Sequence, residues 1–216
     1  MSECQEFQSN ADQGAEQPAP LSRASITDAA ITFIEENGLT KLSMRTLAST
    51  LGCGTMSLYS HVKNRDDLIA AIVQELLERS RLLLVTGTTY PTWQEQIRAS
   101  LFAYRDLAAA YPASFELLAL APYGAAAVAE HLEGIVESLR RAGVPADRAY
   151  EVLGALDAYA TGFLMVWART QTEAGEAEPA HPSPLTELRT LAAFDHGLDV
   201  FIAGFEREFG HAASPN

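Results

Sequence analysis

The chain has 216 residues, 48% of them hydrophobic, and a formal net charge of −13 at pH 7. This length and composition suit one or two folded domains. We expect neither a membrane span nor a signal peptide, because no stretch reaches about 18 uninterrupted apolar residues and residues 1–20 lack a basic start and an apolar run.

The cysteines and histidines indicate neither a disulfide framework nor a metal site. Cys4 lies in a polar segment and Cys53 in an apolar turn, so we expect a reducing, cytoplasmic location. The five histidines lack the spacing of metal ligands. The common hydrolase, zinc-protease, paired-cysteine and phosphate-loop motifs do not occur, and we therefore expect no enzyme, no cofactor and no metal.

The charge is unevenly distributed along the chain. Residues 1–21 hold four acids and no base, residues 22–65 hold five bases and three acids, and the remainder holds ten bases and 21 acids. A basic head on an acidic body suits DNA binding. On charge alone, however, an ordinary acidic protein is the commoner interpretation.

Three short helices are predicted after a tail, residues 1–20, that we expect to be disordered. The first has apolar residues from Ile26 to Ile34 on one face and ends at Asn37-Gly38, which we expect to form a left-handed cap. Ser43 can cap the second helix, and Gly52 permits a tight turn before a third helix at about Thr55–Ser60.

A long connector helix is predicted next, and further helices follow it. Asn64 can cap the connector, which we expect to extend to Leu84. The predicted body helices are Thr92–Ala109, Pro112–Leu118, Tyr123–Ala142, a long helix from Pro145 to Thr172, then Leu185–Phe194 and Asp195–Phe209 after a loop that ends at Pro184. No segment alternates like a strand, so the predicted fold class is all-α, with about nine or ten helices.

The second and third helices have the arrangement of a helix-turn-helix. A glycine turn joins them, and the third helix is short and rich in small polar groups that can approach base edges in the major groove. Spacing alone is a weak indication, because any helical hairpin with a glycine corner has it.

A longer sequence pattern makes the indication of a helix-turn-helix strong. The run Leu39-Thr40-Lys41-Leu42-Ser43-Met44-Arg45-Thr46-Leu47-Ala48, then Leu51-Gly52, then Ser57-Leu58-Tyr59-Ser60-His61-Val62-Lys63-Asn64-Arg65-Asp66-Asp67-Leu68, resembles the N-terminal domain of the TetR family. Beyond residue 85 the resemblance is looser. The resemblance as a whole implies a helix-turn-helix DNA-binding domain at residues 21–67 and a helical ligand-binding and dimerisation domain at residues 68–211.

The resemblance implies that ten residues of the head contact DNA. They are Met44, Arg45, Thr55, Met56, Ser57, Tyr59, Ser60, His61, Lys63 and Arg65. Arg45 would contact a guanine or a phosphate, and Tyr59 and His61 match the family's phosphate clamp. Alternatively, Tyr59 is a half-buried packing residue and His61 a solvated histidine. Gly54 departs from the family pattern, and Thr55 is an alternative cap for the third helix.

The body is expected to form a homodimer and to hold a small-molecule effector. Gly154, Ala158 and Gly162 form a smooth stripe, and Phe194, Leu198, Phe201, Phe205 and Phe209 form an aromatic one; both resemble the family's dimer bundle, although both could instead close the subunit's core. Candidate effector contacts, each of which could equally be an ordinary core or surface residue, are Trp93, Tyr104, Phe115, His131, Asp157 and Trp167.

The sequence thus predicts a repressor that binds a palindromic operator as a homodimer and is released by a small-molecule effector. Two alternatives stay open: a ligand-independent or activating regulator, and a helical small-molecule binder whose DNA head has decayed. Retention of the basic and aromatic residues between Arg45 and Arg65 argues against the second.

Overall fold

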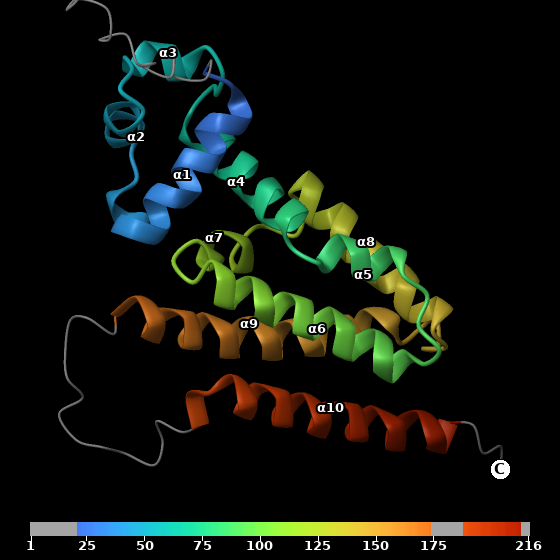
Figure 1. Ribbon diagram of the computed structural model, residues 1–216. Helices are drawn as coiled ribbons and strands as arrows, with labels where there is room; N and C mark the ends of the chain where they lie inside the picture. Colours follow the sequence, from blue (N-terminus) through green and yellow to red (C-terminus); the bar gives the residue numbers. More distant parts are fainter. Residues whose placement is uncertain (1–20, 174–187, 213–216) are drawn as a thin grey trace, which may run out of the picture.

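The computed structural model describes residues 21–173 and 188–212, and these residues form α-helices without any strand (Figure 1). The predicted tail at residues 1–20 and the predicted loop up to Pro184 lie outside the described residues. The helices are α1 (Arg23–Asn37), α2 (Met44–Thr50), α3 (Thr55–Tyr59), α4 (Arg65–Arg79), α5 (Leu82–Gly87), α6 (Trp93–Ala110), α7 (Phe115–Ala119), α8 (Ala126–Arg141), α9 (Ala149–Glu173) and α10 (Leu191–Ala212), with a 3-10 turn, η1, at Leu39–Lys41. The all-α prediction is confirmed.

The caps predicted for the head are present, with one difference in geometry. The Ser43 hydroxyl accepts a hydrogen bond from the Thr46 amide, and the Asn64 side chain accepts one from the Asp67 amide. Gly38 has φ 87° as expected, but its ψ of 148° is extended, so the predicted left-handed cap is wrong in this respect. The chain leaves α1 directly into η1 because a glycine tolerates this backbone conformation.

The predicted connector is broken into two helices. Helix α4 ends at Arg79, where Ser80 becomes extended, and α5 begins at Leu82. The Ser80 hydroxyl donates to the Leu77 carbonyl and accepts from the Leu82 amide, so one side chain serves both helix ends. A single helix to Leu84 was therefore a wrong prediction, because such a local side-chain bond competes with the helical backbone bond.

Two boundaries in the body also differ from the predictions. The long helix begins at Ala149, because the Pro145 carbonyl accepts from the Arg148 amide in a turn that precedes it. The predicted break between Phe194 and Asp195 is absent, since α10 runs through it from Leu191 to Ala212. No glycine or proline stands at that junction to end a helix.

The aromatic face of α10 packs inside its own subunit. Phe194 and Leu198 are fully buried against α9, and Phe201, Phe205 and Phe209 continue the same cluster. Tyr159 of α9 stacks on Phe194, with ring centroids 5.3 Å apart. The interpretation of this stripe as a dimer surface was therefore wrong, because the aromatic rings find their apolar partners on α6 and α9.

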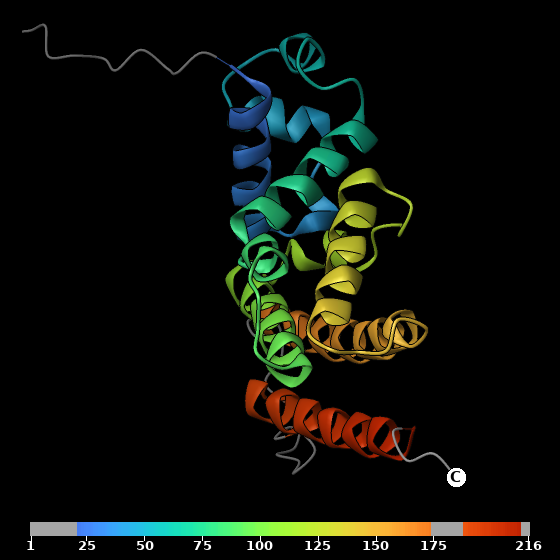
Figure 2. The ribbon, with the colours of Figure 1, turned by 90° about the vertical axis from the view of Figure 1, so that its right-hand side faces the viewer.

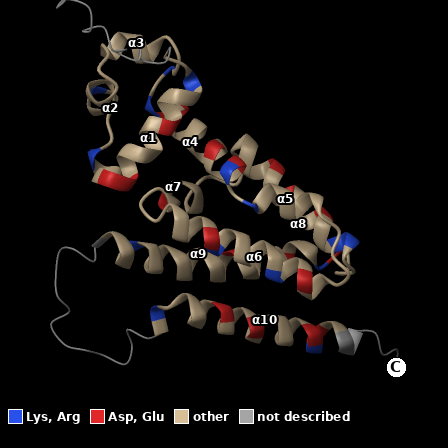
Figure 3. Ribbon diagram, in the orientation of Figure 1, with Lys and Arg blue, Asp and Glu red and all other residues tan. Residues whose placement is uncertain are grey.

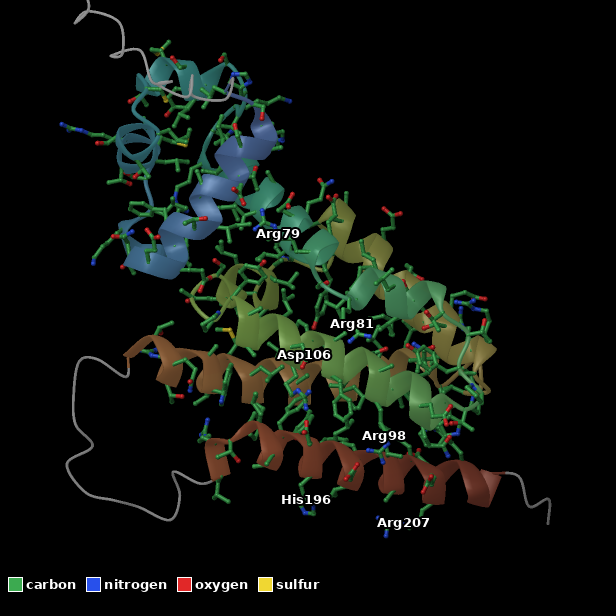
Figure 4. The ribbon with its side chains drawn as sticks, viewed as in Figure 1. Arg79, Arg81, Arg98, Asp106, His196 and Arg207 are labelled. Atoms are coloured by element: carbon green, nitrogen blue, oxygen red, sulfur yellow. The ribbon has the colours of Figure 1, made fainter. Side chains whose placement is uncertain are left out.

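Ion pairs hold α10 beneath the body as a separate layer, which both views of the ribbon show (Figures 1 and 2). Arg98 and Arg105 of α6 pair with Asp199 and Asp195 of α10, respectively, and Arg148 pairs with Glu208. The other face of α10 points away from the body, as His196 and Arg207 do in Figure 4. Helix α10 therefore has one face packed in the subunit and one face free of it.

One apolar cluster joins the head to the upper body. It includes Ile26 and Leu58 from the head, Ile72 and Leu77 from α4, and Leu118 from α7. Helix α4 thus belongs to the core of both parts. In the described part of the chain, no helix combines the length and the apolar character that a membrane crossing needs.

Candidate functional site

The first part of the site is the outward face of α2 and α3. Leu47, Ala48 and Leu58 are buried and hold the two helices together, while Gly52 turns the chain between them with φ 63°. Gly54 precedes α3 as its cap residue, without a side-chain bond, and Thr55 is already helical. The prediction of Thr55 as the cap is therefore wrong.

The side chains predicted to contact DNA lie together on this face. Met56 is 80% exposed and Tyr59 is 44% exposed, although both are large and apolar. Arg45, Ser57, Ser60, Lys63 and Arg65 are also exposed, whereas Met44, Thr55 and His61 are half-buried. Exposed large apolar groups next to exposed hydroxyls form a surface that can read base edges and thymine methyl groups.

The basic residues of the head divide into two kinds. Arg23 makes a bidentate ion pair with Asp67, with both N–O distances 2.8 Å, and thereby ties the start of α1 to the start of α4. This pair holds the pKa of the Asp67 carboxyl well below its usual range. By contrast, Arg45, Lys63 and Arg65 make no ion pair with any described residue, and these cations are available for phosphates. Figure 3 shows basic residues on the head together with acidic residues on α1 and α4, and both kinds along the body.

The second part of the site is a cavity of about 80 Å³ in the body, several times the space that a single water needs. Leu77 of α4 and Leu82 of α5 line it from above, and α6, α7, α8 and α9 supply the other walls. The walls are mainly aliphatic, with a few polar groups. The polar lining residues are Ser100, Tyr104, Tyr123, His131 and Asp157.

The polar groups of the cavity have distinct surroundings. The His131 side chain is buried, its Nδ1 atom has no partner among the described residues, and burial lowers the pKa of His131 to about 4. Imidazole at neutral pH is therefore uncharged here. The Tyr104 hydroxyl lies 3.3 Å from that of Thr161, and burial raises the pKa of Tyr104. The Tyr123 hydroxyl donates a hydrogen bond to Asp157.

Three of the six predicted effector contacts, Tyr104, His131 and Asp157, line the cavity, and three do not. Trp93 packs edge-on against Phe209 near the end of α10, with ring centroids 5.3 Å apart. Phe115 is buried behind Tyr104, with ring centroids 5.0 Å apart, and Trp167 packs in the lower core. These three rings belong to the core and do not line this cavity, because large aromatic rings mark any core and not specifically a cavity.

Sequence reasoning missed Tyr123, Ser100 and most of the aliphatic walls. Tyr123 is in the turn before α8 and reaches Asp157, 34 residues away. No local pattern marks such a contact. The Asp157 prediction rested on a carboxylate among apolar residues of one helix, and Asp157 does line the cavity.

A polar joint links the head to the helices around the cavity. The Glu35 carboxylate, near the end of α1, accepts hydrogen bonds from the backbone amides of Ala113 (3.1 Å) and Ser114 (2.8 Å), just before α7. Arg79, at the end of α4 and labelled in Figure 4, pairs with Asp28 of α1 and with Glu75. Asp28 and Glu35 thus tie α1 to elements outside the helix-turn-helix.

Comparison with known proteins agrees with this geometry. The family model described as bacterial regulatory proteins, tetR family, matches residues 26–72. An HTH-type transcriptional regulator of Saccharopolyspora erythraea is 28% identical over 88% of this chain and 86% of its own length. The class D tetracycline repressor protein of Escherichia coli is 34% identical, over 40% of this chain and 39% of its own length.

A solved structure has the same fold. It is the Streptomyces coelicolor TetR family protein ActR in complex with actinorhodin, with a TM-score of 0.68, 23% identity, and coverage of 91% of this chain and 100% of that one. An exposed helix-turn-helix, matched by the family model, thus stands on a helical body of the same fold. Residues 26–72 therefore form a helix-turn-helix DNA-binding domain of the TetR type, and the rest of the chain has the fold of the TetR family structure that it resembles; the relatives that match most of the chain are transcriptional regulators.

Proposed function

We propose that the chain is a transcriptional repressor that binds a palindromic operator as a homodimer and leaves it when a small-molecule effector enters the cavity. One observation carries the proposal: Leu77 of α4 lines the cavity and also belongs to the apolar cluster that holds the head. The relative named a tetracycline repressor and the structure of ActR with actinorhodin concern those proteins, and they support the same arrangement here.

The DNA contacts divide between positioning and sequence reading. Arg45 would reach a guanine edge, and Met44 the DNA at the start of α2. Thr55, Met56, Ser57 and Ser60 would lie against base edges. Tyr59, His61, Lys63 and Arg65 would contact phosphates and fix the orientation of α3 on the duplex. Seven of these ten side chains are exposed, and the cations among them make no ion pair with a described residue, which supports this assignment.

The dimer would form through the free faces of α9 and α10. Gly154, Ala158 and Gly162 are exposed, and Tyr150 and Val166 extend the same stripe at intervals of four residues. Small residues at this spacing allow a second helix to approach closely. In the dimer, the two α3 helices would stand about 34–36 Å apart and enter successive major grooves.

Release would follow from the polar joint. Leu118 of α7 lines the cavity, and the chain just before α7 is bonded to Glu35 of α1. An effector that pushes α7 or α4 would move α1 and change the separation of the two heads. A coupling of about 3 kcal/mol would weaken operator binding by roughly 150-fold, which suffices for induction.

The test selects duplexes from random DNA with the purified chain and measures binding by fluorescence anisotropy. We expect an inverted repeat whose half-sites are centred about one helical turn apart. Tyr59→Ala should abolish specific binding without loss of helix content, whereas Tyr59→Phe, which keeps the ring, should lose only part of it. Equal operator affinity for Tyr59→Ala and the parent chain would contradict the proposal.

Transcription from a promoter bearing the selected site separates repression from the alternatives. A repressor lowers transcript yield. Higher yield would make the chain an activator, and failure to select any sequence would leave only the small-molecule binder.

A further inference from the structure

The lining of the effector cavity carries an acidic side chain but no basic one. None of its lining residues is a lysine or an arginine, and one, Asp157, is an acid. Asp157 lies on α9 between aliphatic wall residues, Leu156 and Ala160. An anionic ligand would therefore meet a half-buried carboxylate with no cation beside it in the lining, and the two like charges would repel.

The hydrogen bonds around Asp157 leave acceptors unused. Its carboxylate has two oxygens and room for several donors, and the Tyr123 hydroxyl supplies one. Because the Tyr123 hydroxyl donates its hydrogen to Asp157, its oxygen can act only as an acceptor toward a ligand. The pair thus calls for a donor group without acceptors, which describes an ammonium ion.

A second polar side chain of the cavity has an atom without a hydrogen-bond partner among the described residues. His131 lines the cavity, and only 8% of its surface is exposed. Its Nδ1 atom has no hydrogen-bond partner among the described residues. A buried polar atom of this kind usually meets a ligand or a water. An uncharged imidazole neither repels a cation nor attracts an anion.

We propose that the cavity binds a small, largely apolar organic amine, whose protonated nitrogen faces Asp157 and whose uncharged polar substituent, where present, meets His131. This inference rests on the proposed function, because it names the chemical class of the effector. The cavity volume of about 80 Å³ suits a small organic molecule, since a single water needs only about 10–15 Å³.

The test uses three probes that share a phenylethyl body and differ in charge: 2-phenylethylamine, 2-phenylethanol and 3-phenylpropionate. Calorimetry with the full chain at neutral pH should show the amine binding at least about tenfold more tightly than the carboxylate. Asp157→Asn should remove this preference and change the affinity for the alcohol by less than about threefold.

Two matched variants complete the design. Asp147→Asn neutralises an exposed acid outside the cavity and should leave the preference unchanged. His131→Phe should also keep the preference for the amine over the carboxylate, because Asp157 sets it. Equal or tighter binding of the carboxylate, no binding of any probe, or an unchanged preference in Asp157→Asn would overturn the inference.

Binding of the selected DNA is measured on the same preparations without probe. Loss of DNA binding with a retained preference for the amine would refute the proposed function and leave the ligand class standing. Specific DNA binding without that preference would do the reverse.

Discussion

Arg23 differs from the other cations of the head in what its guanidinium binds. It lies in a fork on Asp67 and also donates to the carbonyls of His61 and Asp67. Its guanidinium therefore holds α1 against α4 through the ion pair with Asp67. Lys63 and Arg65, only a few residues from this pair, make no ion pair within the described residues and stand exposed at the start of α4.

We predict that Lys63→Ala and Arg65→Ala each weaken binding to operator and to random DNA alike. Each loss removes a phosphate contact, so the slope of log affinity against log salt concentration should flatten by about one unit. Salt titrations of binding measure this slope. Arg81→Ala is the control, because it removes the same charge from an exposed site at the α4–α5 corner (Figure 4). A slope unchanged in both head variants would place these residues off the phosphates.

Hydrogen bonds between residues three positions apart could be predicted from the sequence, whereas hydrogen bonds between distant parts of the chain could not. Ser43 and Asn64 were recognisable as caps because the amides that they accept from lie three residues later. Glu35 accepts from amides 78 and 79 residues away. On the sequence it is one acid among many, and only the fold brings α7 to it.

Helix α10 comes close to α9 at one glycine. The Tyr159 hydroxyl donates a 2.6 Å hydrogen bond to the Phe194 carbonyl, and its ring lies over Gly197. A Cβ atom at position 197 would lie 2.9 Å from the Tyr159 Cζ and would overlap the hydroxyl. The stacking of Tyr159 on Phe194 and its tilted contact with Phe201 depend on this missing side chain.

We predict that Gly197→Ala destabilises the protein by about 1–3 kcal/mol, because Tyr159 must leave its position and lose its bond to α10. Thermal unfolding followed by circular dichroism should show a melting temperature lower by roughly 2–4 °C for each kcal/mol. Gly204→Ala is the matched control in the same helix, where a Cβ meets nothing within 4 Å. It should be neutral or stabilising by up to about 1 kcal/mol. Equal melting temperatures for the two variants would contradict the close approach.

The period of an apolar stripe fixes which residues share a face but does not identify the partner of that face. The aromatic stripe of α10 was recognised correctly as one face, and its partner turned out to be α9 and α6 of the same subunit. The small-residue stripe of α9 has the same kind of periodicity and lies exposed. Both patterns are equally visible in the sequence, and only the packing separates them.

For the whole molecule, we predict a homodimer at micromolar concentration that Ala158→Glu converts to a monomer. Ala158 lies in the middle of the exposed α9 stripe, so a buried carboxylate there would lack a partner. Sedimentation should show twice the 23.3 kDa chain mass for the parent and a single chain mass for the variant. Ala70→Glu, an exposed site on α4, should leave the dimer intact. A parent chain that sediments at 23.3 kDa would contradict the prediction.

The apolar cluster shared by head and body has a consequence for exchanging parts between regulators. The predicted domain boundary after Asp67 cuts α4 in its first turn and would separate Leu68 and Ile72 from Ile26 and Leu58, with which they form one core. A chimera that takes its head up to residue 67 from this chain would therefore inherit a foreign α4 against α1. Grafts are better made at Ser80, where the helix ends and where Asp28 and Arg79 of the same donor stay paired.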